Sequence, residues 1–407
     1  MIRTPARAEK AVAVGLAAVA LLVLAWLALK PGDWGDWQSE ALRAANALVA
    51  GHVGHFLQLA PAYGGSLILR APFMLATKLW HGHENSVYRA SVAPCLLAAG
   101  VLGVWLASRM RAAGSPRVAC AVALLLCAVN PLSYPALTIG HPEEILGAVL
   151  CAGAVLCAVS DRPTWAAVML GLAIANKEWA VLAVGPVLVG LPRARARALV
   201  IAGAVAGAVL APLMLGGGYV GQAAAAGLNT GVIFQPWQIW WWLGSAGGGH
   251  GYRLAPTWLG GLGHTLPIAL MPPLTALYAW QRRGPGRQRS QDALLLLTLL
   301  LALRCLLDPW DISYYALPVL IALLSWEALT RPRAPVVTLA ATAACWYIFS
   351  GTSRYGFSPD IQALVFTLVS VPSLLVLAVA VYAPGVVRLT TRRVAWLRRP
   401  RGAQAAV

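Results

Sequence analysis

Residues 11–29 read AVAVGLAAVALLVLAWLAL, nineteen positions without a charged side chain, and this stretch decides the fold class. An α-helix needs about 20 apolar residues to cross about 30 Å of hydrocarbon. Similar runs recur along the chain, which is 59% hydrophobic and only 11% charged, whereas a soluble protein carries about 25% charged residues. The sequence therefore predicts an all-α polytopic membrane protein, with a single transmembrane domain over residues 1–407 and no separate soluble domain.

We expect about twelve transmembrane or partly spanning helices. The first run follows three basic residues, but it is longer than a signal-peptide core and has no convincing cleavage site before Lys30 and Pro31. We therefore expect a retained helix. The predicted segments are 11–29, 91–108, 118–136, 144–159, 164–176, 179–191, 199–215, 256–280, 292–307, 315–329, 336–350 and 361–383.

The links between these segments differ in charge. Of the 31 basic residues, 22 fall on the same side as both termini, and ten of the 14 acidic residues fall on the other side. The positive-inside rule places both termini in the cytoplasm. The net charge of +17 then reflects this topology and the anionic inner leaflet, so we expect membrane lipids and no nucleic acid as partners.

Two outer links are long, at residues 30–90 and 216–255. The first begins with GDWGDWQSE at residues 32–40, and helical periodicity follows over 40–49 and 66–80. We expect these two stretches to form interfacial helices. The second link is rich in tryptophan and glycine, which is typical of an interfacial aromatic belt or of a surface that stacks against a sugar.

Asp33 and Asp36 are the first candidates for chemistry, because a carboxylate just outside a membrane helix can deprotonate an acceptor hydroxyl. The alternative is a solvated helix cap. Residues 140–144 read GHPEE and offer His141, Glu143 and Glu144 near the outer end of two helices. They could orient a substrate, or Pro142 and the two acids could simply start a helix. Two or three such donors do not define a metal site.

Lys177 and Glu178 interrupt the apolar stretch 164–191, whose two halves are each too short to span a bilayer. A lysine at such a depth is costly, so a lipid phosphate is a natural partner, although Lys177 and Glu178 could pair with each other. Arg304 could bind an anionic head group or pair with Asp308 one turn away.

Residues 36–51, DWQSEALRAANALVAG, resemble the first outer loop of polytopic GT-C glycosyltransferases. Among these, the chain is most similar to the bacterial family 87 group, which includes polyprenyl-phosphate-mannose-dependent enzymes. Further similarity lies in PAY at 61–63 with LRAPF at 69–73, in GHPEE at 140–144 and in AVMLGLAIANK at 167–177.

The resemblance covers about residues 30–190. The chain departs from the family pattern at His141, Pro142 and Glu143, which replace a glutamine-type turn. It departs again at Glu178 and Trp179, where the family commonly has proline after the lysine.

The resemblance implies a glycosyltransferase of the bacterial plasma membrane with its active site facing outside. It would move mannose or another hexose or pentose from a polyprenyl-phosphate donor to a glycan or glycolipid acceptor. No cofactor is implied, and a metal requirement is left open. The implied roles are Asp36 as general base with Asp33 as second choice, Lys177 with Arg304 or Arg253 at the donor phosphate, and His141, Glu143, Glu144 and Glu178 at the sugar or acceptor.

Two other functions stay open. One is a multi-pass transporter or lipid-linked-sugar flippase, which would place ionisable residues near the bilayer midplane, whereas here they gather at the outer helix ends. The other is a non-catalytic membrane assembly factor, which would not need Lys177 at depth.

Overall fold

The computed structural model describes residues 6–29, 35–80, 84–218, 232–247, 251–259, 262–281, 291–309, 311–331 and 333–384. These residues are mostly helical, which confirms the predicted all-α class. Within the described part of the chain, the strands are β1 (Ile233–Phe234) and β2 (Arg253–Leu254), which pair in antiparallel fashion.

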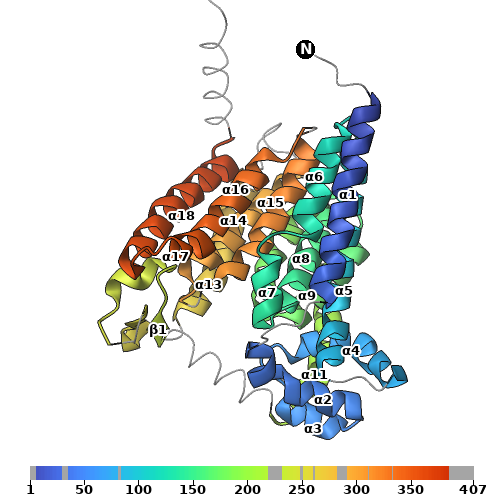
Figure 1. Cartoon of the computed structure of the whole chain (residues 1–407), viewed down its shortest axis with the longest axis vertical. Coiled ribbons are helices and arrows are strands. Elements are labelled where there is room, and N and C mark those ends of the chain that lie inside the picture. The colour runs from blue at the N-terminus through green and yellow to red at the C-terminus, as the bar shows by residue number, and fades with distance from the viewer. Residues whose placement is uncertain are drawn as a thin grey trace, which may run out of the picture.

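A helical bundle makes up most of the molecule (Figure 1). It contains, in chain order, α1 (Ala6–Leu29), α5 (Glu84–Ala112), α6 (Arg117–Ala128), α7 (Ser133–Ile139), α8 (Glu143–Val159), α9 (Pro163–Asn176), α10 (Val184–Gly190), α11 (Arg195–Leu215), α13 (Leu262–Gln281), α14 (Asp292–Leu307), α15 (Ala316–Thr330), α16 (Val336–Trp346), α17 (Thr352–Arg354) and α18 (Pro359–Tyr382). Short 3₁₀ or π turns flank several of them: η3 (Glu178–Ala183), η4 (Ile239–Leu243), η5 (Thr257–Leu259), η6 (Ser313–Tyr315) and η7 (Tyr347–Gly351).

Each predicted apolar run coincides with helical structure, but not every helix is long enough to cross a membrane. In the described residues, seven helical segments have both the length and the hydropathy to do so. Others are shorter, such as α8 with 17 residues and α14 with 16. Several apolar helices thus indicate a membrane-embedded protein, while the twelve spans and the GT-C fold stay predictions.

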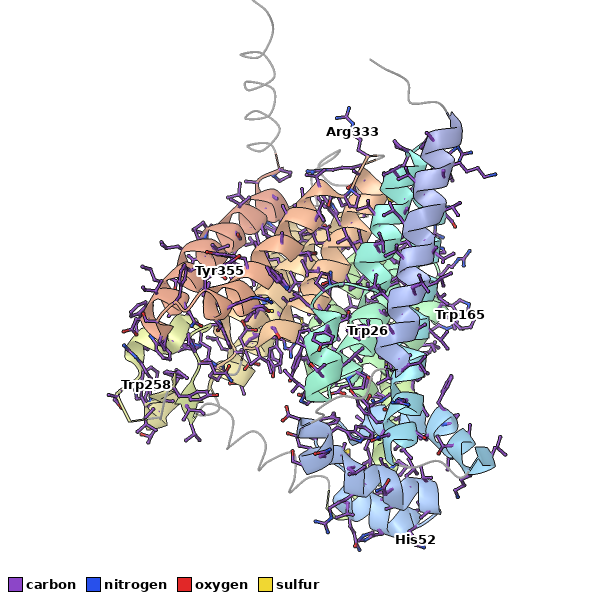
Figure 2. All side chains as sticks on the ribbon, viewed as in Figure 1. Trp26, His52, Trp165, Trp258, Arg333 and Tyr355 are labelled. Carbon is purple, nitrogen blue, oxygen red and sulfur yellow. The ribbon has the colours of Figure 1, made fainter. Side chains whose placement is uncertain are left out.

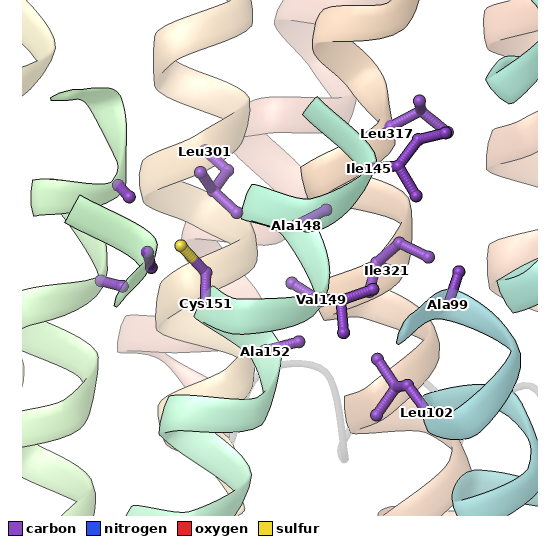
Figure 3. Close-up of a cluster of buried hydrophobic side chains, with 14 of the residues drawn as sticks. Ala99, Leu102, Ile145, Ala148, Val149, Cys151, Ala152, Leu301, Leu317 and Ile321 are labelled. Carbon is purple, nitrogen blue, oxygen red and sulfur yellow. The ribbon is translucent and has the colours of Figure 1, made fainter. Parts of the chain in front are cut away.

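The bundle buries one apolar face and exposes another. Figure 3 shows α8 packed into the centre, where Val149 and Cys151 lie among side chains of neighbouring helices such as Leu301 and Ile321. The helices α1 and α18 differ from α8, because they expose leucines such as Leu22 and Leu368. Exposed leucines along a whole helix are costly in water, so these faces suit lipid.

Residues 35–80 form a layer of short helices at one end of the bundle (Figure 1). The layer comprises η1 (Trp37–Ala41), α2 (Leu42–Ala50), α3 (Val53–Leu59), α4 (Gly64–Ala76) and η2 (Thr77–Trp80). Helices were predicted over 40–49 and 66–80, and the structure has them; α3 was not predicted. The β1–β2 hairpin lies at this same end, whereas Arg333 and the N-terminal end of α1 lie at the other (Figures 1 and 2).

The predicted break inside residues 164–191 is present at Lys177. α9 ends at Asn176, and Lys177 is extended, with φ −159° and ψ 138°, before η3 begins. The layer of short helices contacts this break closely. The Oγ of Ser66 donates to Asn176 Oδ1 at 2.7 Å, and a Cβ on Gly65 would lie 2.0 Å from the Ala175 carbonyl oxygen. Glycine at position 65 is therefore required for this approach.

Candidate functional site

The first turn of α8 carries two buried glutamates. α7 ends at Ile139 and is capped by Gly140, whose φ of +116° suits glycine and turns the chain back toward α8. A Cβ at Gly140 would lie 2.5 Å from the backbone nitrogen of Trp37, so this glycine also lets the Asp36–Trp37 backbone come close. The Glu143 and Glu144 side chains are both fully buried.

Asp36, His141 and Glu143 form a hydrogen-bonded chain. The His141 ring contacts Glu143 Oε1 through Nδ1 at 2.6 Å and Asp36 Oδ2 through Nε2 at 3.0 Å. The side chain of His141 is 7% exposed, whereas that of Asp36 is 42% exposed. The chain therefore runs from a buried glutamate to an aspartate that substrate or solvent can reach.

His141 lies between two carboxylates, which favours its charged form. Burial alone would lower the pKa of His141, but the Glu143 charge and the hydrogen bonds to Asp36 and Glu143 outweigh it and raise the pKa to about 9. At neutral pH the ring is an imidazolium that donates from both nitrogens. Tyr63 and Tyr314 flank it, with ring centroids at 5.6 and 5.1 Å.

Lys177 is shared by the two glutamates of α8. Its Nζ lies 3.2 Å from Glu143 Oε1 and 3.1 Å from Glu144 Oε1, and 5.0 Å from the centroid of the Tyr63 ring. The side chain is 11% exposed. The break between α9 and η3 thus points a lysine at both carboxylates, and Glu178, which follows it, is exposed.

Arg304 is held firmly in place near the end of α14. Its guanidinium contacts both oxygens of Glu144 at 3.4 Å, and it stacks between the Trp179 and Tyr315 rings at 4.7 and 3.9 Å. Glu144 also accepts a hydrogen bond from Trp179 Nε1 at 3.2 Å. These contacts satisfy the Arg304 charge within the protein.

Arg70 of α4 also belongs to the site, although the sequence did not single it out. Its Nε donates to the Ser66 carbonyl at 3.2 Å, and its Nη2 lies 3.7 Å from Glu143 Oε2. Both side chains are 0% exposed, and neither of these two terminal atoms has a hydrogen-bond partner within the described structure. An arginine in the apolar run LILRAPF at 67–73 is the signal that could have identified it.

We call these seven side chains the charge network: Asp36, Arg70, His141, Glu143, Glu144, Lys177 and Arg304. With His141 protonated, these seven comprise four cations and three carboxylates, and Asp308 and Glu178 add negative charge beside Arg304 and Lys177. Buried charges are tolerated only when they are paired in this way. The exposed Asp36 can accept a proton, and the partly exposed Lys177 can contact an anion.

One other predicted site residue lies elsewhere in the structure. Arg253 is on β2, where its Nη2 contacts Asp360 Oδ1 at 2.8 Å and its guanidinium lies 4.7 Å from the Trp241 ring centroid. Arg253 therefore links the β1–β2 hairpin to the start of α18 and is not in the charge network. Asp33 lies outside the described residues.

The described residues contain no group of three or more His, Cys, Asp and Glu side chains arranged to hold a metal ion. No protein-family model matches the chain, and no curated protein matches its sequence. The chemistry of the charge network is therefore the basis for any assignment of function.

Proposed function

We propose that this protein is a GT-C-type membrane glycosyltransferase of the bacterial plasma membrane, with both termini in the cytoplasm. It transfers mannose or another hexose or pentose from a polyprenyl-phosphate donor to a glycan or glycolipid acceptor outside. The observation that supports this most is the presence of an accessible carboxylate, Asp36, and a partly exposed lysine, Lys177, in one charge network. Displacement at a sugar carbon needs both a base and a cation.

Asp36 is the general base of the proposed reaction. His141 donates to its Oδ2 and so leaves Oδ1 for the acceptor hydroxyl. Asp36 takes the hydroxyl proton as the acceptor oxygen bonds to the anomeric carbon of the sugar. The bond between that carbon and the phosphate oxygen breaks, and the electron pair leaves with the polyprenyl phosphate.

Lys177 is the cation that stabilises the departing phosphate. Arg304 is enclosed by two aromatic rings and both oxygens of Glu144, so it contributes mainly through its field. The Nζ of Lys177 sits on a flexible stem and is the more exposed of the two. A lysine ammonium is a point charge that suits a phosphate oxygen.

The test uses the purified full-length protein in nanodiscs, with a panel of labelled polyprenyl-phosphate sugars and acceptor glycolipids extracted from bacterial membranes. Asp36→Asn should slow transfer by about 10²–10⁴-fold, which is the usual contribution of a general base. Asp360→Asn is the matched control, because Asp360 is an exposed aspartate that pairs with Arg253 outside the network. It should transfer at close to the native rate.

Equal transfer by the Asp36→Asn and native proteins would exclude Asp36 as the base. A native protein that is inactive with every donor would overturn the glycosyltransferase assignment. Translocation of a fluorescent lipid-linked sugar in proteoliposomes would then establish the flippase.

A further inference from the structure

The charge network pairs each glutamate of α8 with an arginine of its own. Glu144 has Arg304, and Glu143 has Arg70, while Lys177 lies between the two glutamates. Lys177 therefore contacts both glutamates, and each glutamate also faces its own arginine. If it moves away, both glutamates still face a cation.

The two arginines differ in how closely they engage their glutamates. Arg304 already contacts both oxygens of Glu144. Arg70 stops 3.7 Å short of Glu143 Oε2, beyond hydrogen-bond distance, and both atoms are buried without another hydrogen-bond partner in the described structure. A buried ion pair that stops short of a hydrogen bond is unusual, because closing the gap needs a shift of only about 0.5 Å.

Glu143 is held at present by cations that are also engaged elsewhere. Its Oε1 contacts His141 and Lys177, but His141 also holds Asp36, and Lys177 also holds Glu144. If Lys177 turned to a ligand, Glu143 would keep only His141, which also holds Asp36, and Arg70, whose ion pair with Glu143 lacks a hydrogen bond. Arg70 is then the cation that can strengthen its contact with Glu143 by a small shift.

We propose that Arg70 is a standby counter-ion: it closes onto Glu143 Oε2 when Lys177 releases the glutamates and turns to the phosphate of an isoprenoid-phosphate ligand. The identity of that ligand rests on the proposed function. Lys177 is suited to the movement because it is the most exposed cation of the network. Arg70 is a positioning residue in this scheme and does not touch the ligand.

The first experiment measures binding of farnesyl phosphate, a short isoprenoid phosphate, to the native protein, Lys177→Met, Arg70→Gln and the double variant by calorimetry. Lys177→Met should weaken binding by about tenfold or more, and Arg70→Gln should do the same although Arg70 does not face the ligand. The double variant should bind no more weakly than Lys177→Met, because both substitutions prevent the same step, the movement of Lys177 from the glutamates to the phosphate. Arg70→Lys, which keeps the charge, should retain part of the affinity.

Native affinity in Arg70→Gln, or losses that multiply in the double variant, would overturn the proposal. A simple folding defect would lower the fraction of active protein and leave the dissociation constant unchanged, so the two are distinguishable.

The second experiment needs no ligand. Thermal unfolding is compared for Lys177→Met alone and combined with Arg70→Gln, with Arg253→Gln as the matched control arginine, because it pairs with Asp360 outside the network. Lys177→Met should lower the melting temperature far more when Arg70 is absent, whereas its effect should add simply to that of Arg253→Gln. Additive effects with Arg70→Gln would exclude the standby role. Failure of the native protein to bind farnesyl phosphate would exclude an isoprenoid phosphate as the ligand. The unfolding experiment would still decide the role of Arg70, because it uses no ligand.

Discussion

Replacing His141 by glutamine should change how stability depends on pH, and the size of the change follows from the structure. The folded state raises the pKa of His141 from 6.5 to about 9. A shift of one pKa unit is worth about 1.4 kcal/mol, so the charged ring adds up to about 3 kcal/mol to the free energy of unfolding. Because the folded pKa is the higher one, this contribution is complete below about pH 6.5 and is lost as pH rises through about 9.

The assay is thermal unfolding of the purified protein in detergent between pH 6 and pH 10, followed by tryptophan fluorescence. Glutamine cannot carry the charge, so His141→Gln should be several degrees less stable than the native protein at pH 6. The gap should narrow steadily and approach its minimum near pH 10. His52→Gln, a change at an exposed histidine before α3, is the control and should follow the native curve.

A gap that stays constant over this range would refute the reasoning, because it would show that His141 is neutral between the two carboxylates. A gap that widens with pH would refute it as well.

The remaining predictions concern two structural positions. Gly140→Ala should destabilise the protein more than Gly114→Ala, since both positions have positive φ but only the Cβ at 140 would collide with the Trp37 backbone; the control alone should cost about 1 kcal/mol in thermal unfolding, and equal losses would contradict the close approach. Glu327→Gln should lower the free energy of unfolding by about 1–3 kcal/mol. The buried Glu327 carboxylate accepts hydrogen bonds from two backbone N–H groups at the start of α16 and from Thr338 Oγ1, and an unchanged melting temperature would show that a neutral acceptor suffices.

The helices could be predicted from the sequence, because both lipid and apolar packing require a run of apolar residues whose backbone is hydrogen-bonded within the segment. The break at Lys177 was also predictable, since a charged residue in the middle of an apolar run leaves two helices that are each too short. The residues gathered around α8 come from positions 36 to 304 in the chain. Sequence spacing alone cannot show that such positions meet in space, although charges at the ends of apolar runs indicated six of the seven as candidates.

The sequence did not predict the partners of two arginines, Arg70 and Arg253. Arg70 lies in a stretch that the sequence predicts to be an amphipathic interfacial helix, and no role is predicted for it, whereas the structure buries it against Glu143. Arg253 lies in the outer link 216–255, and its role at the donor phosphate is only what the resemblance implies. Its actual partner, Asp360, is 107 residues away in the chain and has no pattern in common with it.

The contact of Gly65 with Ala175, together with the hydrogen bonds from Ser66 to Asn176 and from Asn176 to the Glu143 carbonyl, has a consequence for engineering. These contacts fix the layer of short helices at residues 35–80 to the N-terminal end of α8 and the C-terminal end of α9. The layer therefore cannot move as an independent lid. A chimera that exchanged only this layer would misplace Asp36 against His141. The smallest unit that can be grafted or redesigned as a whole therefore comprises the layer and both tips.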